Sequence, residues 1–175
     1  MAGSFKTEAI VLRSIRYGEA DRIVHLYSRE YGRIGPIAKG SRQPKSRFGG
    51  RLEPFFHLKL VLYRGRGDLS TVTSAETLDG YGALRASAAG IRAAGDACGA
   101  VLKLLDGVEP NPPAYNLLVR YLGLIDSDPE GPAASLAGML TFRLKLALAA
   151  GFAPELSSCA RCGQSGHLTG FSGAA

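Results

Sequence analysis

The side chains of this sequence best suited to chemistry are basic ones, gathered in the stretch from Arg33 to Arg51, which contains no acidic residue. Glycines and a proline punctuate its second half, so residues 40–50 are expected to form a loop. Arg and Lys neutralise phosphates and release their counterions, so such a loop suits a nucleic-acid backbone. The alternative is a solvated loop whose charges only aid solubility. The residues predicted to bind nucleic acid are Arg33, Lys39, Arg42, Lys45, Arg47 and Arg51.

A second candidate site is the C-x-x-C formed by Cys159 and Cys162, whose thiolates can both reach one zinc ion across a tight turn. A structural zinc needs four ligands, and the sequence supplies only these two with certainty. His167 follows at the spacing of a zinc knuckle, but Ser172 stands where the next ligand is required. We interpret the motif as half of a zinc ribbon, which makes zinc a candidate cofactor with an incomplete site in this chain. A redox role is disfavoured because no parallel βαβ unit surrounds the motif.

No catalytic constellation is found in the sequence. There is neither a G-x-x-x-x-G-K-[ST] loop nor a G-x-G-x-x-G turn to cradle a nucleotide. Glu19 and Asp21 are the closest acidic pair of the N-terminal half, but no further carboxylates converge with them to hold Mg²⁺. The sequence therefore predicts a protein that is not an enzyme, with a nuclease as the disfavoured alternative. His25 and Cys98 are interpreted as packing residues.

The positive charge of the chain belongs entirely to its N-terminal half. Residues 1–80 carry fourteen Lys and Arg against eight Asp and Glu, whereas residues 81–175 carry seven of each. Such an asymmetry favours an anionic partner for the first half. Nucleic acid is favoured over a membrane, because the basic residues lie among strand signals rather than on an amphipathic helix. Three cysteines make no disulfide framework, so a reducing cytoplasm is expected.

The first 80 residues have the pattern of short strands. Alternation is clearest over residues 55–63, where Leu58, Leu60 and Leu62 share one face. The opposite face is either the outer surface of a barrel or a platform for base stacking, formed by Phe55, His57, Lys59 and Tyr63. The other predicted strands are 9–17, 22–27, 34–38 and 69–74. Five short strands without room for crossover helices predict a five-stranded antiparallel barrel of the OB type.

From about Gly80 the apolar period becomes helical and predicts helices over 84–105, 113–125 and 133–150. Asn111 and the prolines after it are typical of a helix start. The third helix is apolar on most sides and is therefore expected to be buried, and Gly151 should end it. The chain thus divides into an OB-type barrel at 1–80, an all-α helical bundle at 81–154 and a partial zinc-ribbon segment at 155–175.

Seven short runs follow one another in a characteristic order along essentially all 175 residues. They are 7–12 (TEAIVL), 17–24 (YGEADRIV), 31–33 (YGR), 38–40 (AKG), 52–56 (LEPFF), 149–154 (AAGFAP) and 159–163 (CARCG). In this order they resemble the RecO family of bacterial recombination mediators. Each run alone is a weak signal, and the specificity lies in the ordered set.

The resemblance implies an N-terminal OB fold, a helical domain and a zinc ribbon of two C-x-x-C pairs. It also implies proteins that bind single- and double-stranded DNA, anneal complementary strands, and work with RecR to load RecA onto strands coated by single-stranded-DNA-binding protein. The family's basic surface would map onto the stretch from Arg33 to Arg51. The second C-x-x-C and the closing helices would lie beyond Ala175, so the C-terminal part of the pattern is expected to be missing here.

Two hypotheses follow from the sequence. In the first, the chain is a non-enzymatic DNA-repair mediator of the cytoplasm, associated with the nucleoid and with no membrane, whose basic loop lowers the repulsion between two strands. In the second, it is an interaction scaffold, with DNA binding secondary. Its helical half would then dock an acidic peptide tail through Arg120, Arg143 or Lys145 beside exposed apolar residues.

Overall fold

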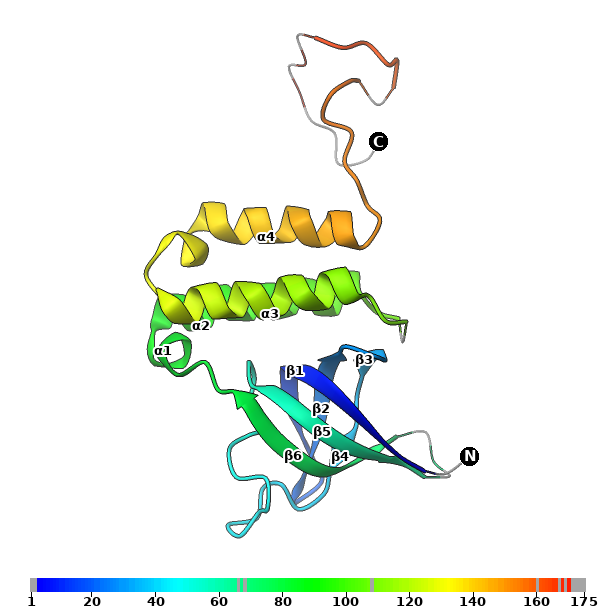
Figure 1. The fold of residues 1–175 in the computed structure, drawn as a ribbon, viewed down its shortest axis with the longest axis vertical. Coiled ribbons are helices and arrows are strands. Elements are labelled where there is room, and N and C mark those ends of the chain that lie inside the picture. Colours follow the sequence, from blue (N-terminus) through cyan, green and yellow to red (C-terminus); the bar gives the residue numbers. More distant parts are fainter. Residues whose placement is uncertain are drawn as a thin grey trace.

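A β-barrel and a layer of helices above it make up most of the molecule (Figure 1). The computed structural model describes residues 3–65, 67, 69–107, 109–159, 161–166, 168 and 170. The strands are β1 (Gly3–Tyr17), β2 (Asp21–Ser28), β3 (Gly32–Ile34), β4 (Ile37–Ala38), β5 (His57–Arg64) and β6 (Thr71–Asp79). The helices are α1 (Gly82–Ala86), α2 (Ala88–Leu104), α3 (Pro112–Ser127) and α4 (Leu136–Ala149), with a 3-10 turn at Pro132–Ala134. No helix in the described residues is both long and apolar enough to cross a membrane.

The barrel closes through five strands in the order β1-β5-β6-β4-β2, and β2 returns to β1. The sixth strand, β3, pairs only with β2, at the edge of this ring. This arrangement confirms an OB-type barrel, with one difference from the expected antiparallel pairing. β4 and β6 run parallel where Ile37 pairs with Thr71. The parallel pair follows from the topology, because β2 and β5 are each antiparallel to β1, and β4 and β6 are in turn antiparallel to β2 and β5.

Alternating apolar residues fill the barrel interior. Leu58, Leu60 and Leu62 of β5 are fully buried, as their spacing predicts. The interior core is completed by Ala9, Val11, Val24, Leu26, Ala38, Phe48, Leu52 and Val72. β5 begins two residues later than expected, because Phe55 adopts a positive φ of 76° that no strand residue can hold. The predicted third strand is likewise split into β3 and β4, because Pro36 lies between them.

The first predicted helix is two helices. Ser87 has extended dihedrals and separates α1 from α2, and its hydroxyl accepts a hydrogen bond from the Gly90 N–H at 3.2 Å. A side chain at Gly90 would meet the Leu84 carbonyl oxygen at 2.6 Å, so this glycine permits the close turn. The predicted caps of α3 and α4 are confirmed. Asn111 accepts from the Ala114 N–H at 3.0 Å, and Gly151, with φ +86°, follows the end of α4.

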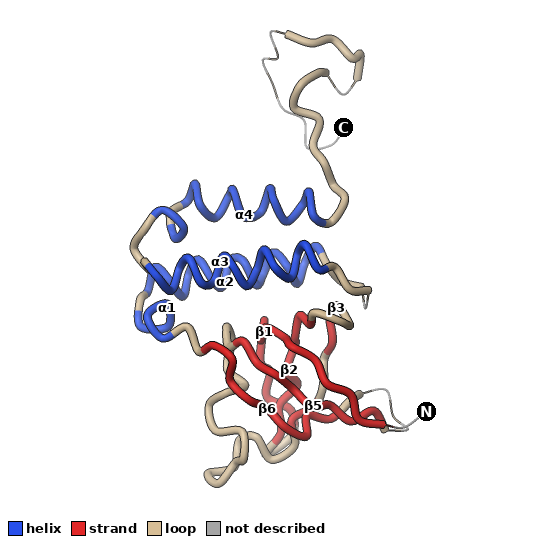
Figure 2. The backbone as a smooth tube through the Cα atoms, viewed as in Figure 1, coloured by secondary structure: helices blue, strands red, loops and turns tan. Residues whose placement is uncertain are grey.

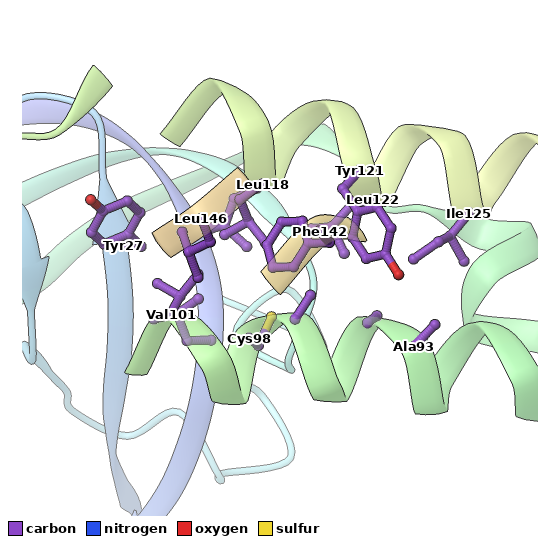
Figure 3. Packing of buried hydrophobic residues seen from close by; sticks show 14 of the residues in the cluster. Tyr27, Ala93, Cys98, Val101, Leu118, Tyr121, Leu122, Ile125, Phe142 and Leu146 are labelled. Carbon is purple, nitrogen blue, oxygen red and sulfur yellow. The ribbon is translucent and has the colours of Figure 1, made fainter. Parts of the chain in front are cut away.

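One hydrophobic core joins the helices to the barrel (Figure 3). Ile10, Leu12 and Tyr27 project from the outer side of β1 and β2 into the space beneath α2 and α3. Within the helical layer Tyr121 of α3 stacks on Phe142 of α4, with ring centroids 4.5 Å apart. Other members of this core are Ala93, Cys98, Val101, Leu118, Leu122, Ile125 and Leu146. The expected packing role of Cys98 is confirmed, and burial raises the pKa of its thiol to about 12.

The expected burial of α4 is only half correct. Phe142 and Leu146 are buried against the other helices. The opposite side of the helix is exposed, with Leu136 69% accessible and Leu140 52% accessible. The helix is apolar on most sides, but its neighbours in the described structure cover one side only.

Candidate nucleic-acid interface

The loop between β4 and β5 lies at the end of the barrel farthest from the helices (Figure 2). We call residues 39–51 the basic loop. It is a chain of turns in which backbone N–H groups bond to carbonyls three residues earlier, as from Gln43 to Gly40 and from Ser46 to Gln43. Gly40 and Gly49 have φ values of +64° and +54°, which a side chain rarely permits. The loop is therefore an ordered surface rather than an open span of chain.

Two apolar side chains anchor this segment in the barrel. Phe48 is 1% exposed and Leu52 is 3% exposed, and both belong to the interior core. Asp21 adds a polar tie, because its carboxylate accepts a hydrogen bond from the Gly40 N–H at 2.8 Å. Asp21 is one of the two carboxylates weighed for Mg²⁺, and this bond gives it a structural role. No cluster of three or more potential metal ligands occurs among the residues that the structure describes.

Five of the six predicted DNA-binding residues are exposed on the basic loop: Lys39, Arg42, Lys45, Arg47 and Arg51. Arg42 donates to the Gly18 carbonyl at 3.3 Å and Arg47 to the Val72 carbonyl at 3.4 Å. Arg51 donates to the Arg47 carbonyl at 3.4 Å. Carbonyl acceptors orient a guanidinium without neutralising it. Among the described residues none of the five forms an ion pair, so their charges face solvent.

Arg33 lies elsewhere. It is on β3, where its guanidinium donates to the Leu102 carbonyl at 2.9 Å and its backbone N–H donates to the Gly107 carbonyl at 3.2 Å. Leu102 belongs to the last turn of α2, whose carbonyls lack partners within the helix. A cation there also complements the negative end of the helix dipole. Arg33 therefore joins the barrel to the helical layer and is not part of the basic loop.

Sequence reasoning overlooked basic residues on the β1–β2 hairpin. Arg16 lies opposite Arg22 in the pairing of the two strands. Arg22 forms an ion pair with Glu53 at 2.7 Å, just beyond the basic loop, so this end of the hairpin borders the loop. Arg16 is exposed there. The sequence predicted strands over 9–17 and 22–27, but nothing in it placed these strands beside residues 39–51.

The stacking platform, one of two interpretations of the outer face of β5, does not fit the position of His57. His57 faces α3, where its Nε2 lies 2.8 Å from the Tyr115 hydroxyl. Desolvation at this barrel–helix interface lowers the pKa of His57, against the opposing influence of Glu8 and Asp79. A base cannot stack on a ring that already packs against a helix.

The two cysteines of the C-x-x-C lie on one tight turn. The Gly163 N–H donates to the Cys159 carbonyl at 2.8 Å, and Gly163 has a φ of +74°. Hydrogen bonds from the Cys162 and Arg161 backbone lower the pKa of the Cys159 thiol. The turn can present two thiolates to a metal, but the described residues do not complete a four-ligand zinc site. His167 lies outside the described residues.

A groove lies between α3 and α4 and has a volume of about 450 Å³. Its floor includes Tyr121 and Phe142, and its rim includes Arg120 and Lys145. Arg143, the third cation predicted for peptide docking, instead forms an ion pair with Asp96 of α2. The helical layer therefore combines an apolar floor with two cations at its edge.

Comparison with known proteins identifies the family. The family described as "Recombination protein O N terminal" matches residues 1–81, and "Recombination protein O C terminal" matches residues 92–175. A protein of Rubrobacter xylanophilus named DNA repair protein RecO is 45% identical over 161 residues, covering 91% of this chain and 62% of the relative. Proteins of the same name from Anaeromyxobacter dehalogenans and Cutibacterium acnes are 41% identical over 159 residues and 38% identical over 172 residues.

Coverage of these relatives is partial. The chain spans 61% of the Anaeromyxobacter protein and 70% of the Cutibacterium protein, while 90% and 97% of the chain itself is matched. The two matched ranges, 1–81 and 92–175, divide the chain between the end of β6 and the first turns of α2. The chain belongs to the RecO family.

Proposed function

We propose that this chain is a non-enzymatic mediator of DNA repair and recombination that binds single- and double-stranded DNA through the basic loop. The observation that carries the proposal is the group of five exposed cations on an ordered loop anchored by Phe48 and Leu52. The names of the relatives, DNA repair protein RecO, support the same role.

The loop would act by neutralising phosphates. If each of its five cations contacts one phosphate, log affinity should fall with log salt by about 4.5 on duplex and about 3.5 on single strands. No base edge is read in this mode, so affinity should not depend on sequence. Two strands held at one cationic surface repel each other less, which is the basis for annealing. Assisted loading of a recombinase would require the partners that the family resemblance implies, RecR and single-stranded-DNA-binding protein.

Charge reversal of Arg42, Lys45 and Arg47 to Glu tests the loop. We expect weaker binding of both single and double strands, and a salt slope reduced by about 2 on single strands, because three phosphate contacts are lost. A matched control reverses Arg92, Lys103 and Arg120, exposed cations of α2 and α3, and changes the net charge equally. Equal losses in the two triple variants would show that only net charge matters and would refute the site. Fluorescence anisotropy of labelled oligonucleotides gives both quantities.

Annealing is tested separately with two complementary oligonucleotides, first bare and then coated with single-stranded-DNA-binding protein. Acceleration of both reactions supports the mediator role. Acceleration of bare strands alone restricts the chain to binding and annealing. Binding without annealing refutes the mediator role and leaves a DNA-binding barrel.

A second function is favoured by the α3–α4 groove, and we propose that it docks an acidic peptide segment with apolar side chains. The apolar floor at Tyr121 and Phe142 suits the apolar side chains, and Arg120 and Lys145 suit the acidic ones. Reversing Arg120 and Lys145 to Glu should weaken binding of a labelled Asp-rich peptide with a Leu-Phe end by at least about 5-fold, which is about 1 kcal/mol. Reversal of Arg92 and Lys103 is the control, and an equal loss there would refute the groove.

A further inference from the structure

A second hollow lies at the end of the barrel where β1 begins and β5 ends. We call it the mouth pocket. It has a volume of about 230 Å³ and is lined by Gly3, Ser4, Phe5, Tyr31 and Arg64. The mouths of β-barrels are frequent sites of ligand binding.

The walls of the mouth pocket are two aromatic rings and a cation. Phe5 and Tyr31 meet edge to face, with centroids 4.8 Å apart and planes at 62°. The Arg64 guanidinium carbon lies 5.4 Å from the Phe5 centroid. Strand alternation places Phe5 on the interior side of β1 and Arg64 on the side of Leu62, so both side chains converge at the open end of the barrel.

The turn that carries Tyr31 is held firmly against β1. The Ser28 hydroxyl accepts from the Tyr31 N–H at 3.0 Å and donates to the Gly32 carbonyl at 3.0 Å. The Arg29 N–H donates to the Glu8 carbonyl at 2.9 Å. These bonds fix the backbone of the turn that carries Tyr31 before any ligand arrives, which lowers the entropic cost of binding.

We propose that the mouth pocket takes one unstacked nucleobase of a DNA single strand and that Arg64 contacts the phosphate beside it. Aromatic faces bind every base, because each base has a π-face. The volume lies below the roughly 300–1,000 Å³ of sites for free small ligands, so one ring of a polymer fits better than a free nucleotide. The proposal rests on the proposed DNA binding and extends it from backbone to base.

The geometry lets one strand reach both sites. Arg47 of the basic loop donates to the Val72 carbonyl, Val72 lies opposite Leu62, and Leu62 lies opposite Phe5. Neighbouring strands are about 4.8 Å apart, so Val72 and Phe5 are separated by roughly 10 Å across the wall of the barrel. A few nucleotides of an extended single strand span that distance.

The test compares a 20-nucleotide thymidine oligomer with an abasic oligomer of equal length, both measured by fluorescence anisotropy with the full chain. The wild type should bind the thymidine oligomer at least about 5-fold more tightly, because one stacked base is lost in the abasic strand. Tyr31→Ala should abolish this preference and leave the affinity for the abasic oligomer unchanged. Tyr31→Phe keeps the ring and should keep the preference, as should Tyr63→Ala, which removes an exposed ring next to Arg64 in the sequence.

The outcomes separate this proposal from the one on which it rests. If the wild type binds both oligomers equally with a steep salt slope, the basic loop stands and the mouth pocket is refuted. If Arg64→Gln weakens the binding of both oligomers while Tyr31→Ala changes the affinity for neither, the pocket contacts phosphate only and the base proposal is refuted. If the wild type binds neither oligomer, both proposals fail. Retention of the preference in Tyr31→Phe and its loss in Tyr31→Ala would support the pocket.

Discussion

The basic loop and the barrel–helix interface both contain arginines from the stretch between Arg33 and Arg51, but these arginines have opposite roles in the two regions. Arg42 donates to the carbonyl of Gly18 in an exposed turn and Arg47 to the carbonyl of Val72 on β6, and neither forms an ion pair in the described residues, so their charges remain directed at solvent. Arg33 donates to the last turn of α2 and joins two layers of the fold. The same residue type therefore supplies a surface in one region and a structural contact in the other.

The difference teaches that the acceptor decides the role of a cation. A carbonyl in a turn or along a strand, as accepts from Arg42 and Arg47, orients a guanidinium and leaves room for a phosphate. A carbonyl at a helix C-terminus is an unpaired group near the negative end of a dipole, and it holds the cation as a cap. Three predictions test whether the two regions are really distinct.

The largest effect is expected at the anchor of the basic loop. Phe48→Ala removes a ring that is 1% exposed in the barrel interior, which should lower the free energy of unfolding by about 3–5 kcal/mol. Arg42→Ala, six residues away on the surface, should change it by less than about 0.5 kcal/mol. Urea unfolding followed by circular dichroism measures both. A loss below about 1 kcal/mol for Phe48→Ala would show that the loop is not anchored through this ring.

Much of the fold could be predicted from the sequence, because periodicity reports burial directly. Leu58, Leu60 and Leu62 alternate in the sequence and lie together in the core. The points at which helices end were harder to predict from the sequence, because they depend on single residues with ordinary side chains. Ser87 ends one helix and caps the next, and the helical period runs through it unchanged. The parallel pair of β4 and β6 depends on which strands meet, and local pattern carries no such information.

The sequence predicted which residue types form the candidate site, but it did not predict how they are arranged in space. A run of Arg and Lys indicates a polyanion, and five of the six predicted residues do share one exposed loop. The sequence could not show that Arg33 contacts a helix 69 residues further along the chain. Nor could it bring Tyr31 and Arg64 to the same end of the barrel, because that juxtaposition arises from the closure of the sheet.

The second prediction separates the two kinds of arginine. Arg33→Gln should lower the free energy of unfolding by about 1–2 kcal/mol, because a charge-assisted hydrogen bond to a helix end is lost in a partly exposed setting. DNA affinity of the folded variant should stay unchanged. Arg42→Gln should do the reverse, with stability preserved and the salt slope on single strands reduced by about 0.7. If Arg33→Gln weakens DNA binding as much as Arg42→Gln does, the contrast between the regions fails.

The smallest effect concerns pH and should leave the basic loop unaffected, since the basic loop contains no histidine. Burial lowers the pKa of His57 in the folded protein below its ordinary value of 6.5. The unfolded chain therefore takes up a proton first, so stability should decrease as pH falls below about 6.5. His25, whose pKa is also lowered by burial, acts in the same direction.

Urea unfolding at pH 7.5 and 5.5 measures this difference in the wild type, in His57→Gln and in His25→Gln. The His57 variant should lose part of the pH dependence, because the proton uptake that favours the unfolded chain is removed along with the imidazole. An unchanged pH dependence would mean that the contact between His57 and Tyr115 does not shield the ring from water. A loss of pH dependence in stability without any change in the salt slope of DNA binding would establish that the interface and the basic loop respond to different variables.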